Sequence, residues 1–179
     1  MAPTNPPRPL ADEHSPYYGR YIALVPAGAL VTLLTRQGEE TAALLAACPE
    51  DRARERPAPG EWNAIEIVGH LADTERVLTY RALRIARSDT TPLEGVGDFA
   101  AYVAAANFAG RTFADVAAEF FAVRQASLAF FRSLDAAAWA RVGVADGERV
   151  SVRALGYIVA GHELHHAPDR RRYGAGLAS

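Results

Sequence analysis

The chain has 179 residues, of which 50% are apolar, and its 21 acidic and 19 basic residues leave a formal net charge of -2. This length fits one domain built around a single hydrophobic core. A nearly neutral balance argues against a protein that binds nucleic acid electrostatically, because such domains are usually basic. We therefore expect no nucleic-acid partner.

Residue usage narrows the class further. All 19 basic residues are Arg, and Ala is the commonest residue with 37 copies, so the composition favours helix. The single cysteine, Cys48, excludes an intramolecular disulfide and a cysteine-rich zinc site, and it fits the reducing cytoplasm. No apolar run reaches the roughly 18 residues that a membrane span needs. We expect a cytoplasmic protein with no membrane partner.

The first half of the chain alternates between proline-rich and periodic segments. Residues 1–26 contain six prolines, which predict an extended arm. Leucines recur with helical periodicity over residues 27–47 and predict a first helix. Residues 48–61 combine three prolines, a glycine and dense charge, which indicates a solvated connection.

The second predicted helix begins at a capping box. Asn63 and Glu66 have the spacing at which their side chains satisfy backbone donors at a helix start. Ile67, Leu71 and Ile85 then fall on one narrow arc, and the helix should end near residue 87.

The remaining segments predict two more long helices. Residues 99–108 fit a short helical piece, and residues 112–134 repeat apolar side chains at helical spacing. Residues 139–149 contain a turn-rich, hairpin-like connection, after which Ser151 should cap a fourth helix that runs to about residue 166. We expect an all-α protein, a four-helix bundle over about residues 27–173 in a single domain of residues 1–179.

Histidines on two of these helices form a candidate metal site. His162 and His166 are four residues apart and share a helix face with Leu155 and Ile158, so both imidazoles should point inward. A third ligand is needed, and His70 lies near the apolar arc of the second helix. His165 falls at the rim of the face and is better suited to a supporting role. Ligating imidazoles must be neutral, so metal occupancy should fall as pH drops through about 6.

Other readings of these residues stay open. A single inward His is more often a hydrogen-bonded core residue than a ligand. Residues 162–166 also match the zincin pattern, with Glu163 as base, but only Asp169 follows as a downstream ligand. The pair Glu163 and His166 matches half of a di-iron site, yet no second Glu-x-x-His occurs. Asp73 could support a ligand or orient a substrate, and the arginine run at 170–172 is more simply a solvated tail.

Two stretches of the chain resemble a known family. PGEWNAIEIVGHLADTERVLTYRALRIA and SVRALGYIVAGHELHH, with an aromatic helix between them, are similar to the DinB-like superfamily, which includes the YfiT-type metal-dependent hydrolases. The resemblance runs from about Tyr17 to Tyr173. It implies a four-helix bundle, often a homodimer, that binds zinc, nickel or a similar divalent ion. The positions that match the family's ligands are His70, His162 and His166.

The resemblance also suggests a class of reaction. Some relatives transfer low-molecular-weight thiols such as bacillithiol or mycothiol to electrophiles, some isomerise maleylpyruvate, and many have no established activity. We expect a thiol S-transferase or hydrolase that acts on a small electrophilic substrate, with the metal activating a thiolate or a water. Glu163, Asp73 or His165 would move the proton. The alternative is a non-catalytic metal-binding or stress-response protein.

Overall fold

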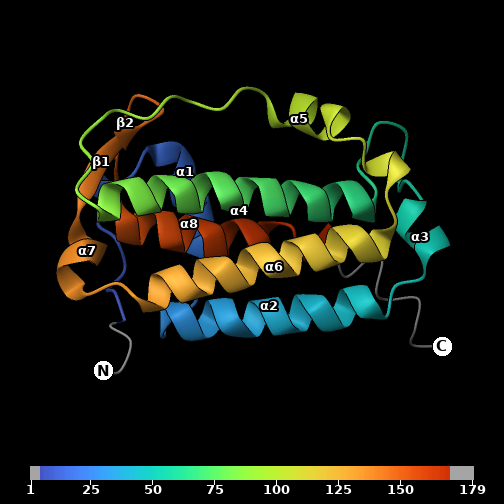
Figure 1. Cartoon of the computed structure of the whole chain (residues 1–179), viewed down its shortest axis with the longest axis horizontal. Helices are drawn as coiled ribbons and strands as arrows, with labels where there is room; N and C mark the ends of the chain where they lie inside the picture. Colours follow the sequence, from blue (N-terminus) through green and yellow to red (C-terminus); the bar gives the residue numbers. More distant parts are fainter. Residues whose placement is uncertain (1–4, 170–179) are drawn as a thin grey trace.

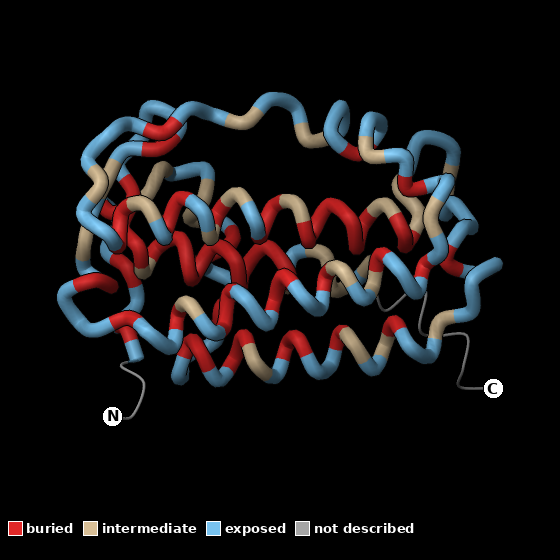
Figure 2. Tube along the Cα trace, in the orientation of Figure 1, coloured by how far each residue is buried: buried red, intermediate tan, exposed pale blue. Residues whose placement is uncertain are grey.

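The computed structural model describes residues 5–169 and shows a bundle of four long helices (Figure 1). Helix α4 packs against both α6 and α8, and α2 packs against the same two helices from the other side. Figure 2 shows that buried residues follow the inward faces of these helices. The predicted four-helix bundle is therefore confirmed. The four helices are α2 (Leu30–Ala46), α4 (Ala64–Ala86), α6 (Phe113–Arg132) and α8 (Val152–His165).

Side-chain caps explain where three of the long helices begin. At the start of α4, the Asn63 side chain accepts from the Glu66 backbone at 3.0 Å, and the Glu66 carboxylate accepts from the Asn63 backbone at 3.0 Å. Thr112 caps α6 and Ser151 caps α8 through equivalent bonds of 3.2 Å and 3.0 Å. These bonds satisfy donors that have no partner within the helix. The predicted starts of the three helices are confirmed to within one or two residues.

The prediction of an extended arm over residues 1–26 is wrong for residues 11–24. Described residues of this segment form a short 3-10 helix, Ala11–Glu13, and helix α1 (Pro16–Leu24), which packs against α8. Pro16 occupies the first position of α1, where its missing backbone donor costs nothing. Nine residues without another proline follow, and Tyr21 and Ile22 are buried, so tertiary packing completes the helix.

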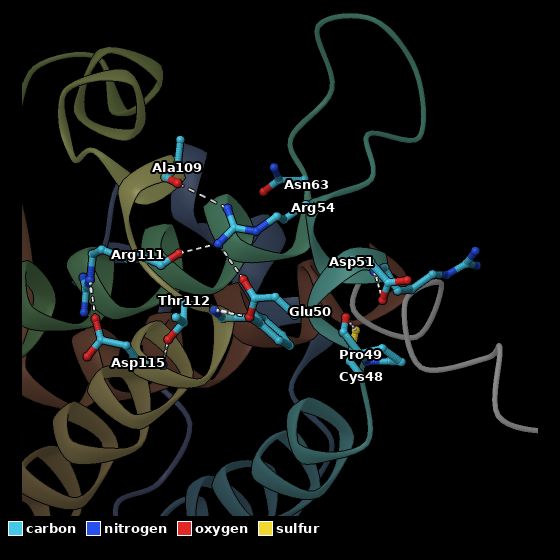
Figure 3. Close-up of polar contacts among 12 residues, drawn as sticks. Cys48, Pro49, Glu50, Asp51, Arg54, Asn63, Ala109, Arg111, Thr112 and Asp115 are labelled. Atoms are coloured by element: carbon cyan, nitrogen blue, oxygen red, sulfur yellow. Dashed lines mark hydrogen bonds and ion pairs between the residues drawn. The ribbon is translucent and has the colours of Figure 1, made fainter.

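The charged connection after α2 is also more structured than predicted. It contains helix α3 (Glu50–Arg54), and the Glu50 carboxylate accepts from the Phe113 backbone at 2.7 Å (Figure 3). Arg54 donates to the carbonyl of Arg111 at 2.7 Å, so α3 is held against the start of α6. These polar contacts close one end of the bundle.

Shorter elements complete the chain. A tight turn at Asp146 and Gly147, both with positive φ, joins two antiparallel strands, so the expected hairpin-like connection is a true hairpin. It leads directly into α8. Within residues 5–169, no helix has the length and apolar character that a membrane crossing requires. The shorter elements are α5 (Phe99–Ala105), a 3-10 turn (Phe108–Gly110), α7 (Ala136–Ala140), β1 (Val142–Ala145) and β2 (Glu148–Ser151).

Candidate metal centre

Three histidines converge between α4 and α8. His70 comes from α4, His162 from the last turn of α8, and His166 from the residue that follows α8. One ring nitrogen from each lies within 4.8 Å of the others, and the Nε2 atoms of His70 and His162 are 3.2 Å apart. The structure thus brings together the three residues that the helix faces singled out.

Two glycines fix the helices beside these histidines. A Cβ atom at Gly161 would lie 2.0 Å from the backbone oxygen of Tyr21, so α1 can cross α8 this closely only where α8 lacks a side chain. A Cβ atom at Gly69 would lie 2.1 Å from the ring of Phe108. Each glycine directly precedes a histidine of the cluster, so these close approaches also set the positions of the imidazoles.

The surroundings of the cluster keep the imidazoles of His70 and His162 neutral. His70 and His162 are 6% and 7% exposed, while His166 is half-buried. Burial, with a smaller contribution from His166 and His165, lowers the pKa of His70 to about 4. Burial likewise lowers the pKa of His162 well below its ordinary value. Near pH 7 the two buried rings are therefore in the form that can donate a lone pair to a metal.

Polar neighbours orient two of the rings. Thr74 Oγ1 lies 3.4 Å from Nδ1 of His70, one helical turn away, and Asp169 Oδ2 lies 3.3 Å from Nδ1 of His166. With Nδ1 of His70 beside Thr74, its Nε2 faces Nε2 of His162 within the cluster. A partner of this kind on the second ring nitrogen is usual for metal-binding histidines.

A cavity of about 320 Å³ adjoins the cluster, and His70, His162 and His166 form part of its wall. The ring of Trp62 lies 4.9 Å from that of His70, and Phe99 lies 5.2 Å from it on another side. Tyr21 stacks edge-on against His162 at 5.4 Å. An apolar molecule could therefore reach the imidazoles through an aromatic enclosure.

Sequence reasoning missed most of this enclosure. Tyr17, Tyr18 and Tyr21 line the cavity from α1, but they lie in the segment expected to be an arm. Trp62 packs against the core beside α4 and also lines the cavity. The spacing of Tyr17 and Tyr21, four residues apart and hence on one helix face, was the available signal.

The expected proton carriers lie elsewhere. Glu163 is 1% exposed and forms an ion pair with Arg124 at 2.8 Å, because it is rotated about 100° around α8 from His162. Asp73 pairs with Arg76 at 3.1 Å on the outer side of α4. His165 is exposed and packs against Tyr21. None of the three lines the cavity. The arginine run at 170–172 lies outside the described residues.

Comparisons with known proteins agree with this architecture. A solved structure, YfiT from Bacillus subtilis, matches with a TM-score of 0.71 and 14% sequence identity, over 98% of this chain and 96% of that one. It is described as a probable metal-dependent hydrolase with an unusual four-helix bundle topology, and at this identity the likeness shows a shared fold. The curated proteins contain no match.

The family comparison covers most of the chain. The model of the DinB superfamily matches residues 33–168, a span that begins within α2 and includes all three histidines of the cluster. The chain belongs to the DinB superfamily.

Proposed function

We propose that His70, His162 and His166 bind a divalent metal ion and that the protein is a metal-dependent enzyme acting on small electrophilic molecules, as a thiol S-transferase or a hydrolase. The observation that carries this proposal is the convergence of three imidazole nitrogens within 4.8 Å in the wall of a cavity. A cluster that served only to fill the core would not need the adjoining space.

The donor set fits such an ion. The cluster offers three nitrogen ligands, two of them from buried neutral rings, which suits zinc or nickel. The Nε2 atoms of His70 and His162 face each other at 3.2 Å. If Nδ1 of His70 donates to Thr74, its Nε2 presents a lone pair that a cation would satisfy.

The chain's own residues define what the site can do. A bound divalent ion with three protein ligands supplies an open position that lowers the pKa of a water or thiol. Thr74 and Asp169 hold two of the imidazoles in place. The rings of Trp62, Phe99 and Tyr21 exclude water and orient an apolar electrophile beside the histidines.

The first test is the metal content per chain of untagged protein purified without chelator. We expect about one zinc or nickel ion per chain, lost in His70→Ala and His162→Ala because two ligands do not complete the site. His165→Ala is the matched control, because this exposed neighbour lies outside the cavity and should leave the metal in place. Wild-type protein that is empty and also refuses added zinc or nickel would refute the site.

The second stage screens the loaded enzyme with thiol cosubstrates, and with water alone, against small electrophiles. Turnover that disappears in His162→Ala would support the enzymatic proposal. A stoichiometric metal without turnover in any of these reactions would favour the non-catalytic, metal-binding alternative.

A further inference from the structure

The cavity contains a buried cation whose charge no carboxylate of residues 5–169 neutralises. Arg81 on α4 is 4% exposed and lines the same cavity as the three histidines. Among the described residues its single hydrogen bond runs from Nη2 to the backbone carbonyl of Glu94 at 3.0 Å, and no carboxylate lies within ion-pair distance. A guanidinium has five donors, and burying one without a countercharge is costly.

A second buried arginine shows what pairing looks like in this protein. Arg124 is 1% exposed and forms ion pairs with Glu75 at 2.7 Å and with Glu163 at 2.8 Å. Arg81 is buried almost as deeply, yet it lines the histidine cavity and has no carboxylate partner among residues 5–169. The missing countercharge can therefore come from a ligand.

Helix geometry places Arg81 at a defined distance from the histidines. It follows His70 by 11 residues, which at 100° per residue brings it back to within about 20° of the same face. The two Cα atoms are separated along the axis by roughly 16 Å, a gap that the long arginine side chain can shorten. Thr74, Val77 and Leu78 line the cavity between them. The cavity thus has imidazoles and a guanidinium at separate places along one largely apolar wall.

We propose that Arg81 binds the carboxylate of an elongated substrate whose reactive group lies at the histidine cluster, an inference that rests on the proposed function. A carboxylate matches the planar donors of a guanidinium and gains charge-assisted hydrogen bonds in a shielded site. The aromatic and aliphatic lining suits an apolar body between the two ends. Asp98 is the other charged group of the lining, but it is exposed and its carboxylate caps α5 through the backbone of Ala100 at 2.9 Å.

The test compares two probes that differ in charge: 4-phenylbutanoate and its neutral amide, 4-phenylbutanamide. Their affinities are measured by titration calorimetry on the folded protein, both zinc-loaded and chelator-treated. We expect wild-type protein to bind the carboxylate at least about tenfold more tightly than the amide, with and without zinc. Arg81→Gln should abolish this preference. Arg87→Gln, which removes an exposed arginine of the same helix region, should retain it.

A further variant keeps the proposal testable if Arg81→Gln does not fold. Arg81→Lys keeps the positive charge but loses the planar donor pair, so the preference should fall by a smaller factor than in Arg81→Gln. An unchanged preference in both folded variants would overturn the proposal. Arg81 would then act only by donating a hydrogen bond to the backbone carbonyl of Glu94. A preference that exists only with zinc would also overturn it, because the carboxylate would then be a metal ligand. Failure of the proposed function gives a different result, since a protein that binds no metal can still show a preference that depends on Arg81.

Discussion

Two buried polar clusters contain neighbouring residues of α8. They differ in the empty space beside them and in whether their charged groups are paired. His162 belongs to the histidine cluster, which adjoins a cavity of about 320 Å³. Its neighbour Glu163 belongs to a network with Arg124 and Glu75, and the cavity that these three residues line measures about 10 Å³. Adjacent residues of one helix therefore contribute to an open site and to a closed one.

The network around Arg124 links the four long helices of the bundle. Arg124 on α6 binds Glu75 of α4 and Glu163 of α8, and it donates to the carbonyl of Leu34 on α2 at 3.1 Å. Burial disfavours its charge, but the attraction of the two carboxylates outweighs this effect and raises its pKa. All four long helices thus meet at one guanidinium, whereas the histidine cluster leaves ring nitrogens directed at each other. This contrast assigns a structural role to the network and supports the proposal that the histidines bind a metal ion.

The largest expected effect tests the structural half of this contrast. Arg124→Met leaves two buried carboxylates without a countercharge, so the free energy of unfolding should fall by about 3–5 kcal/mol. Urea unfolding followed by circular dichroism measures the change. Arg132→Met is the matched control, because this exposed residue of α6 also bonds to α2, through Thr35 at 3.0 Å. Its cost should stay below about 1 kcal/mol.

A second experiment separates two causes of the lower stability of Arg124→Met: the unpaired carboxylates and the loss of packing. Adding Glu75→Gln and Glu163→Gln to Arg124→Met removes the unpaired charges, so much of the lost stability should return. A triple variant as unstable as the single one would show that the arginine acts through its packing and would weaken the contrast between the clusters.

Local rules were enough to predict the long helices of the bundle and the helix faces that carry the three histidines. Caps and the 3.6-residue period depend on residues within a few turns of each other, which is why Asn63, Thr112 and Ser151 mark helix starts correctly. The same period placed His162 and His166 on an inward face.

Features that depend on distant partners could not be predicted in this way. Helix α1 is completed by burial of Tyr21 and Ile22 against a helix more than a hundred residues later. The carboxylate of Glu163 was expected to act at the site because it lies within the histidine motif, but Arg124, far away in the sequence, holds it on another side of α8. Its angular offset from His162 was visible in the sequence, whereas the identity of its partner was not.

The second prediction concerns the pH dependence of the metal-free protein. The folded-state pKa of His70 is lowered to about 4, while the unfolded value is near 6.5. The unfolded state therefore binds more protons between these values, so the associated stability is present above pH 6.5 and is lost as pH falls toward 4. The shift corresponds to about 3 kcal/mol for this ring, and His162 acts in the same direction.

Unfolding free energies measured in chelator from pH 7 to pH 4 would show this slope. His70→Asn removes one of the two titrating rings and should flatten it. The guanidinium of Arg124 adds nothing to this slope, because its raised pKa keeps it charged throughout this range. Equal slopes in wild type and His70→Asn would mean that the histidine cluster is not the acid-sensitive part of the interior.

The smallest expected effect tests whether the open cluster is oriented as a ligand set. Thr74→Val keeps the shape of the side chain but deletes the hydroxyl 3.4 Å from Nδ1 of His70. The ring then loses the partner that fixes its tautomer, so zinc affinity should fall about tenfold, while folding stability changes little.

Thr79→Val is the matched control, because Thr79 lies on the same helix but bonds to Ser127 at 3.2 Å, away from the histidines. Competition for zinc with a chromophoric chelator measures both variants. Equal affinities would mean that packing by Trp62 and Phe99 alone orients His70, whereas a loss confined to Thr74→Val would show that the hydroxyl prepares the ring for a metal.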